Sequence, residues 1–238
     1  MTAPAAPLLR AEGLTRRYGD FVALDGVDVT LARGESVALA GPNGAGKTTL
    51  LSILAGVTQA TDGTVDDPGG RPGWVPQRPS LYGRLTTAEN LRLFATLEGD
   101  ADPAGLTAEL IARADLERFA DQAAHTLSTG TLQRLNLCVA LAGRPDALLL
   151  DEPTATLSPD QRHRLWDWLT ELRDEAGLAV MFSTQSVDEA VRRADRLVVL
   201  ARGRVAFAGR PRELAGDAAV EPSEAEAAFL RLVADEES

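Results

Sequence analysis

Short runs of apolar residues recur along the chain, and segments with helical spacing separate them. Five such runs lie at residues 36–41, 74–77, 147–151, 179–184 and 196–203. Each is apolar almost throughout and is bounded by turn-forming residues, which is typical of strands buried on both faces of a parallel sheet. The alternation of these strands with helices predicts an α/β fold with a mostly parallel sheet.

The N-terminal segment follows a different pattern. Apolar and polar side chains alternate in residues 8–19 and 27–34, and this alternation places Val27, Val29 and Leu31 on one face. A period of two residues is typical of a strand with one exposed face. We therefore expect antiparallel strands beside the parallel core.

The middle of the chain has helical spacing only. Residues 80–144 contain no run that resembles a strand. We predict a helical subdomain at these residues, inserted into an α/β core formed by residues 1–79 and 145–215. The three helical stretches lie at residues 86–99, 107–120 and 131–143.

Residues 216–238 are expected to form a C-terminal tail whose helical part packs on the body of the domain. Residues 216–223 have the composition of a linker, and residues 224–233 have the spacing of a short amphipathic helix. A Pro- and Gly-rich stretch at residues 66–73 predicts a turn between two strands. The whole chain is thus expected to be one α/β domain with a helical insertion.

Composition narrows the class of protein. The 238 residues are 45% hydrophobic and 25% charged, which are ordinary globular values. The net charge of −11 disfavours nucleic acid or a polybasic membrane surface as a partner. No segment approaches the roughly 18 apolar residues of a transmembrane helix, and the N-terminus has no signal-like pattern. We expect a cytoplasmic chain that reaches any membrane through a partner chain.

The cysteine, histidine and tryptophan residues give structural indications. Cys138 is the single cysteine and lies among apolar helix positions, so it is expected in the core of a protein from a reducing compartment. His125 and His163 are too isolated to indicate a metal site. Trp166 and Trp168 cannot share a helix face, so we expect Trp168 in the core and Trp166 at a boundary.

The strongest chemical signal is the sequence GPNGAGKT at residues 41–48, which matches G-x-x-x-x-G-K-S/T in full. It follows a predicted strand and precedes a predicted helix, as a phosphate-binding loop should. The loop N–H groups can surround the β-phosphate, Lys47 can reach the β and γ oxygens, and the Thr48 hydroxyl can ligate Mg²⁺. The ATP-binding residues predicted here are Gly41, Asn43, Gly44, Ala45, Gly46, Lys47, Thr48 and Thr49.

A second signal is the acidic pair that ends the apolar run at residues 147–151. Asp151 would lie beside the metal with Thr48, and Glu152 could polarise the attacking water. Two adjacent carboxylates at the end of a buried strand are costly unless a cation uses them. The sequence therefore predicts a site for ATP with Mg²⁺.

With these motifs, the chain from about Leu8 to about Leu214 resembles the nucleotide-binding subunit of ATP-binding cassette (ABC) transporters. The resemblance implies a P-loop NTPase core of the RecA-like kind. It also implies that Tyr18 stacks on adenine and that Gln77 links Mg²⁺ and the attacking water to the helical subdomain. The resemblance therefore implies two roles for Gln77, as a catalytic residue and as a metal ligand.

The sequence LSTGTLQR at residues 127–134 resembles the family's signature segment. The resemblance implies that Ser128 and Gly130 cap the γ-phosphate of a facing subunit in a head-to-tail dimer. The resemblance also implies two protein partners. One is an integral-membrane permease in contact with residues 78–94, and the other is a second nucleotide-binding subunit in a homodimer or a heterodimer.

The chain departs from the family's pattern where groups face the γ-phosphate or the partner subunit. Gln185 replaces the switch histidine, and its amide can donate a hydrogen bond but never ionises. In the signature, Thr129 replaces the first glycine and Thr131 replaces the glutamine. Ser158 replaces the aspartate of the loop that reaches across the dimer.

These features predict an ATPase subunit of an ABC transporter, with Glu152, Gln77 and Gln185 as catalytic residues and slow turnover. Residues 78–91 resemble the corresponding segment of bacterial exporters, so we expect an exporter at the cytoplasmic face of the membrane. One alternative is a hydrolysis-deficient regulator or scaffold that uses ATP as a clamp. Another is a DNA-repair or translation cassette, which the acidic charge disfavours.

Overall fold

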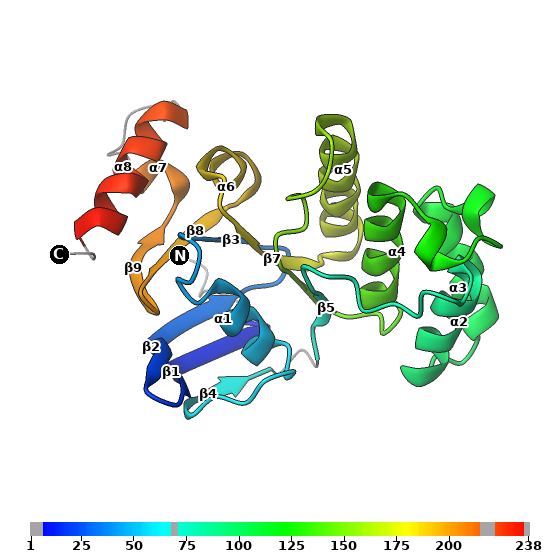
Figure 1. Ribbon diagram of the computed structural model, residues 1–238, viewed down its shortest axis with the longest axis horizontal. Coiled ribbons are helices and arrows are strands. Elements are labelled where there is room, and N and C mark those ends of the chain that lie inside the picture. The colour runs from blue at the N-terminus through cyan, green and yellow to red at the C-terminus, as the bar shows by residue number, and fades with distance from the viewer. Residues whose placement is uncertain (1–6, 68–70, 215–221, 236–238) are drawn as a thin grey trace.

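The computed structural model describes residues 7–67, 71–214 and 222–235, and its central element is a six-stranded sheet (Figure 1). The strand order is β5-β6-β7-β3-β8-β9, and all neighbours pair in parallel except β8 and β9. The five predicted strands are the parallel ones. The strands are β3 (Ser36–Ala40), β5 (Gly73–Val75), β6 (Ala147–Leu150), β7 (Ala179–Thr184), β8 (Arg196–Ala201) and β9 (Arg204–Gly209).

Two separate apolar clusters cover the two faces of this sheet. Successive residues of a strand point to opposite faces, so Ala38 and Phe182 belong to one cluster, while Leu39 and Met181 belong to the other. Every residue of β3, β6 and β7 is buried. This explains why these strands are apolar at consecutive positions instead of alternating ones.

The N-terminal strands form a second, antiparallel sheet of order β2-β1-β4, as the alternating pattern predicted. Val27, Val29 and Leu31 are buried together, and the residues between them are exposed. The inner face packs with α1 (Lys47–Leu54) in one of the two apolar clusters. The strands are β1 (Leu9–Tyr18), β2 (Phe21–Leu31) and β4 (Asp62–Asp66).

The sequence analysis implied a strand before the turn at residues 66–73 but did not locate β4, because four of its five residues are exposed and no apolar pattern marks it. The predicted turn at residues 66–73 does lie between two strands, β4 and β5. Its central residues, 68–70, lie outside the described part of the chain. β9 was also missed, because its partly buried residues form neither a continuous nor an alternating apolar run.

Three helices occupy the middle of the chain and lie together at one end of the molecule (Figure 1). They are α2 (Thr87–Leu97), α3 (Pro103–Arg113) and α4 (Thr129–Leu141). The second predicted stretch, residues 107–120, was placed too late. The helix begins at Pro103 because the Asp102 carboxylate caps it, accepting from the Gly105 N–H at 3.0 Å. Cys138 is fully buried in α4, as predicted, and burial raises the pKa of its thiol.

The remaining helices follow the core strands. They are α5 (Pro159–Ala176), α6 (Val187–Arg193), α7 (Pro211–Leu214) and α8 (Pro222–Asp235). The predicted C-terminal helix corresponds to α8, whereas residues 216–221 of the predicted linker lie outside the described residues. Among the described residues, no helix combines the length and apolar character needed to cross a membrane.

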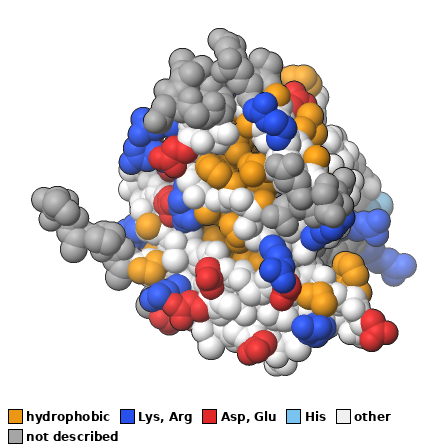
Figure 2. Space-filling model, turned by 90° about the vertical axis from the view of Figure 1, so that its left-hand side faces the viewer, with side chains coloured by type: hydrophobic (Ala, Val, Ile, Leu, Met, Phe, Trp, Pro, Cys, Tyr) orange, Lys and Arg blue, Asp and Glu red, His pale blue; other side chains and the backbone are white. Residues whose placement is uncertain are grey.

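α8 packs against α6, α7 and β9. Figure 2 views the molecule from the side of α8 and β9, and it shows hydrophobic side chains gathered in the middle of this face with charged side chains around them. Phe229 of α8 is buried, whereas Leu230 is 59% exposed. The helix therefore turns one apolar edge inward and leaves part of its apolar surface to solvent.

The expectation for Trp166 was wrong. Trp168 is buried as predicted, but Trp166 is even less exposed, at 3%. The Trp166 ring packs edge-on against Phe182 with centroids 4.6 Å apart, and its Nε1 donates to Glu189 at 2.9 Å. A buried hydrogen-bond acceptor allows an indole to be enclosed where the helical spacing alone predicts a boundary.

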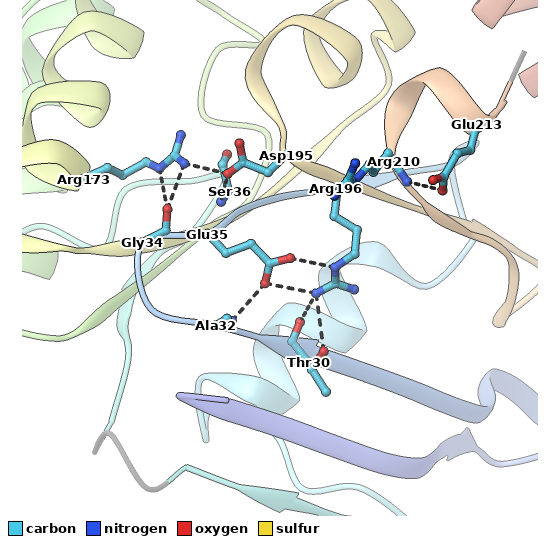
Figure 3. Close-up of polar contacts among 10 residues, drawn as sticks. All are labelled: Thr30, Ala32, Gly34, Glu35, Ser36, Arg173, Asp195, Arg196, Arg210 and Glu213. Carbon is cyan, nitrogen blue, oxygen red and sulfur yellow. Dashed lines mark hydrogen bonds and ion pairs between the residues drawn. The ribbon is translucent and has the colours of Figure 1, made fainter. Parts of the chain in front are cut away.

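Polar contacts hold the start of β3, which is the end of the strand opposite the phosphate loop (Figure 3). Arg196 of β8 donates to Glu35 at 2.7 Å and to the Thr30 carbonyl of β2 at 2.6 Å. Arg173 of α5 donates to the Gly34 carbonyl at 2.8 Å and to Asp195 at 2.6 Å. These contacts join the antiparallel sheet to the parallel core.

Candidate functional site

The phosphate loop connects β3 to α1, and its glycines permit its shape. Gly46 is the N-cap of α1 and has a φ of 106°, a left-handed conformation that strains other residues. A Cβ atom on Gly46 would also lie 2.6 Å from the Ala23 carbonyl oxygen of β2. The loop can therefore wrap tightly at the helix N-terminus, where unpaired N–H groups and the helix dipole favour an anion.

Lys47 is buried at the centre of this loop. Its ammonium group donates to the carbonyl oxygens of Gly41, at 2.7 Å, and Pro42, at 3.0 Å. Burial lowers the pKa of Lys47, while the negative charges of Glu152 and Asp151 raise it to a smaller extent. The loop thus holds a desolvated cation that can exchange carbonyl oxygens for phosphate oxygens.

Thr48 and Asp151 contact each other across the two motifs, as expected of a shared metal site. The Thr48 hydroxyl donates to Asp151 Oδ2 at 2.8 Å, and the Ser183 hydroxyl donates to Oδ1 at 2.6 Å. Asp151 is 1% exposed. A hydroxyl and a carboxylate are hard oxygen ligands of the kind that Mg²⁺ prefers, so this pair fits the ion.

The three predicted catalytic residues lie together at the ends of three neighbouring strands. The Gln77 side chain donates to Glu152 Oε2 at 3.1 Å, and the Gln185 side chain donates to Oε1 at 2.7 Å. The backbone of Glu152 has a φ of 46°, and its N–H donates to the Ser183 hydroxyl at 2.9 Å. A non-glycine residue in this left-handed conformation indicates local strain, which often accompanies function.

Ser183 was not assigned a role from the sequence. Its hydroxyl lies between the two acidic residues, donating to the Asp151 carboxylate and accepting from the Glu152 N–H. The signal available in the sequence was a serine within the mostly apolar run that forms β7. A buried hydroxyl on a central strand needs a partner, and here the partner is the acidic pair.

The signature residues Ser128 and Gly130 lie at the N-terminal end of α4. Ser128 is the N-cap of α4, accepting from the Thr131 N–H at 3.3 Å, and its hydroxyl lies 2.8 Å from that of Thr131. They line a cavity of about 500 Å³ between α4 and α5, together with Ser158 and Gln161. Residues 41–49 contribute nothing to the lining of this cavity.

Ser158 has a local role that the sequence analysis did not foresee. It is the N-cap of α5 in a capping box, in which its N–H donates to Gln161 Oε1 at 3.1 Å and its hydroxyl accepts from the Gln161 N–H at 3.4 Å. The pattern S-x-x-Q at residues 158–161 was the available signal. The replacement of aspartate by serine thus keeps a helix cap while it removes a charge.

Tyr18 ends β1, and its side chain is exposed to 48%. The guanidinium carbon of Arg16 lies 4.5 Å from the centre of its ring. An exposed aromatic ring can stack on a planar base. Stacking on adenine stays a prediction for this residue.

Comparisons with known proteins show the family of the chain. A family model described as ABC transporter matches residues 24–155. The Nod factor export ATP-binding protein I of Ralstonia nicotianae is 37% identical over 225 residues, covering 88% of this chain and 69% of that protein. The aliphatic sulfonates import ATP-binding protein SsuB 1 of Nocardia farcinica is 44% identical over 208 residues, covering 85% of this chain and 84% of that protein.

A solved structure is similar as well. The dimeric post-hydrolysis structure of the ATP-binding cassette MJ0796 bound to ADP and Pi has a TM-score of 0.76 and 28% identity, covering 85% of this chain and 98% of that one. The chain belongs to the ABC transporter family, and its fold is that of the family's P-loop NTPase cassettes. The resemblance inferred from the motifs is therefore confirmed.

Proposed function

We propose that the chain is the ATP-binding subunit of an ABC transporter and that it hydrolyses ATP with Glu152 as the base. The observation that carries this proposal is the arrangement of Glu152 between the amides of Gln77 and Gln185, beside the Thr48–Asp151 pair. The names of the relatives, which are ATP-binding proteins of export and import systems, support it.

In this mechanism the loop residues bind the phosphates and the acidic pair acts on the metal and the water. Lys47 binds the β- and γ-phosphates, and Thr48 and Asp151 hold Mg²⁺, with Gln77 as a further metal ligand. When bound, Mg²⁺ offsets the charge that develops on the phosphates. Glu152 accepts one amide hydrogen bond on each carboxylate oxygen, and each oxygen keeps a lone pair to orient the attacking water.

Turnover is proposed to be slow because of Gln185. One N–H of its amide already donates to Glu152, and the other is free to contact the γ-phosphate. A protonated histidine would bring a positive charge to that contact, which the amide lacks. Hydrogen bonds to charged groups contribute roughly 1.5 to 3 kcal/mol, which corresponds to about 10- to 150-fold in rate.

We propose that two cassettes pair head to tail, so that Ser128 and Gly130 of one subunit face the ATP of the other. The position of both residues at the N-terminus of α4, beside a cavity that residues 41–49 do not line, supports this pairing. ATP binding closes the pair and hydrolysis reopens it. In a homodimer both ATP sites carry every departure from the family's pattern. In a heterodimer the partner subunit can supply one of the two sites with its own signature segment.

The permease partner is proposed to dock at residues 78–94, at the cytoplasmic face of the membrane. Tyr82 is 56% exposed there, and its ring lies 6.2 Å from that of Phe94. Asn90 holds the backbone of Tyr82, accepting from its N–H at 2.9 Å and donating to its carbonyl at 3.1 Å. The likeness of residues 78–91 to exporter segments supports transport out of the cell.

A second candidate function is an ATP-binding regulator or scaffold that does not hydrolyse ATP. It is favoured by the Ser128 hydroxyl, which is engaged by Thr131, and by Ser158, whose hydroxyl caps α5 and offers the partner subunit no carboxylate. The deciding experiment is steady-state ATP hydrolysis by the purified chain with Mg²⁺ and with a chelator, beside nucleotide affinity on the same samples. If the chain binds ATP but shows no Mg²⁺-dependent hydrolysis, the proposal of an ATPase is replaced by that of a regulator or scaffold.

A further inference from the structure

Glu189 is a buried acidic residue whose side chain accepts three hydrogen bonds from neutral groups. It lies on α6 and is 7% exposed. Three side chains donate to it: the Thr154 hydroxyl at 2.7 Å, the Trp166 indole at 2.9 Å and the Thr184 hydroxyl at 2.7 Å. None of the ion pairs among the described residues includes Glu189. Burying a carboxylate is costly unless such bonds compensate it, so this arrangement needs a reason.

The two threonines come from the segments that carry the proposed catalytic residues. Thr154 follows Glu152 by two residues, and Thr184 directly precedes Gln185. Gln185 and Glu152 also contact each other, at 2.7 Å. The two segments are thus joined twice, once at the reacting end and once through the carboxylate of Glu189. A cavity of about 200 Å³ lies between these two connections and is lined by residues of both segments.

We propose that Glu189 is a positioning residue that fixes the distance between the base Glu152 and the switch residue Gln185. The proposal rests on the proposed ATPase function of this site. Glu189 does not reach substrate, and it acts by holding Thr154 and Thr184 at a constant separation. The start of α6 is held by its N-cap Ser186, whose hydroxyl accepts from the backbone N–H of residue 189 at 3.2 Å and whose own N–H donates to Thr184 at 3.0 Å.

The pattern of donors favours a carboxyl group at this position. Three donors converge on one side chain, and a carboxylate can accept at both of its terminal atoms, whereas an amide accepts at only one. In Glu189→Gln, one terminal atom becomes an NH₂ group that donates, so the bond to Thr184 must reverse or break. Glu189→Gln is nearly the same size as the native side chain, so it tests acceptance of hydrogen bonds and not packing.

A matched control is available at the opposite ends of the parallel strands, just before β3. Glu35 is a partly buried carboxylate that accepts from Arg196 at 2.7 Å and from the Ala32 N–H at 2.9 Å (Figure 3). Glu35→Gln therefore weakens a bonded carboxylate without touching the site. Both variants should lower thermal stability, and only Glu189→Gln should alter catalysis.

The first test is kinetic. For Glu189→Gln we expect kcat to fall about tenfold, the effect of losing one hydrogen bond that orders the transition state, with the Kd for ATP changed less than about twofold. Glu35→Gln should keep the wild-type kcat. Equal kcat in Glu189→Gln and wild type, or a parallel loss in Glu35→Gln, would overturn the positioning role.

The second test needs no hydrolysis. Amide hydrogen exchange is measured on wild type, Thr154→Val and Trp166→Phe without nucleotide. If Glu189 joins the two segments, Thr154→Val speeds exchange at residues 184–190 as well as around its own position, and Trp166→Phe has less effect on either segment. Acceleration confined to the neighbourhood of Thr154 overturns the proposal. If Thr154→Val shows this coupling but wild type hydrolyses no ATP, the ATPase function fails and the connection through Glu189 stands.

Discussion

The side-chain amide of Gln185 donates to the Glu152 carboxylate at 2.7 Å, so the residue at the switch position contacts the proposed base directly. The two residues are far apart in the sequence and meet because β6 and β7 are parallel neighbours whose C-terminal ends share one edge of the sheet. A glutamine here still orients the carboxylate, but it brings no charge to the γ-phosphate.

Substitutions of Gln185 test this reading of the switch position. We expect Gln185→His to raise kcat, because an imidazolium adds a positive charge to the contact with the γ-phosphate. Gln185→Ala should lower kcat by about tenfold, because Glu152 loses a donor that orients it. Both are measured by steady-state hydrolysis beside ATP affinity. A lower kcat in Gln185→His than in wild type would show that the amide is the better partner for Glu152.

Glu152→Gln should abolish turnover and leave ATP binding intact. The amide has the size of the carboxylate but cannot accept the proton of the attacking water. We therefore expect ATP-bound dimers to accumulate, which size-exclusion chromatography with and without ATP would detect. Glu109→Gln, at an exposed residue of α3, is the control and should behave as wild type. Residual turnover near the wild-type rate in Glu152→Gln would move the role of base to another residue.

Lys47→Ala should abolish tight binding of Mg-ATP. The ammonium group is the buried cation of the phosphate loop, and its removal leaves the phosphates to the loop N–H groups alone. Equilibrium binding of a fluorescent ATP analogue measures the loss. Thermal unfolding without nucleotide is the control for folding. Wild-type affinity in Lys47→Ala would refute the assignment of the ATP site.

The pKa of Lys47 gives a pH dependence with a defined sign. Burial lowers this pKa below 10.5 in the folded protein, so the unfolded chain binds more protons at pH values between the folded pKa and 10.5. The contribution of Lys47 to the free energy of unfolding therefore rises with pH through that window. ATP binding changes in the opposite direction, because it needs the charged ammonium group. Denaturant unfolding and ATP titration at increasing pH, compared with Lys47→Met, should separate the two trends.

Gly130 and Gln161 should show coupled effects on stability. A Cβ atom on Gly130 would overlap the side-chain amide of Gln161, which caps Ser158. We expect Gly130→Ala to destabilise the protein by about 1 kcal/mol, the size of one lost hydrogen bond. In a Gln161→Ala background the same change should stabilise it, because alanine favours a helix more than glycine does. Additive effects in denaturant unfolding would contradict the contact between α4 and α5.

Much of the fold and the core of the site were predictable because their signals are local. The five parallel strands are continuous apolar runs, and the phosphate loop is one unbroken segment whose glycines and lysine have no other common use. The acidic pair is equally local, since Asp151 and Glu152 directly follow a buried strand. The sequence by itself therefore determined the α/β core, the phosphate loop and the acidic pair.

Other features depend on residues that are distant in the sequence. The burial of Trp166 and of Glu189 follows from their meeting across α5 and α6, and the contact of Gln185 with Glu152 follows from the pairing of β6 with β7. β4 and β9 lie at sheet edges and carry exposed residues, so no apolar pattern marks them. Only the tertiary structure decided these points, because a buried polar group is stabilised by partners that the chain brings together when it folds.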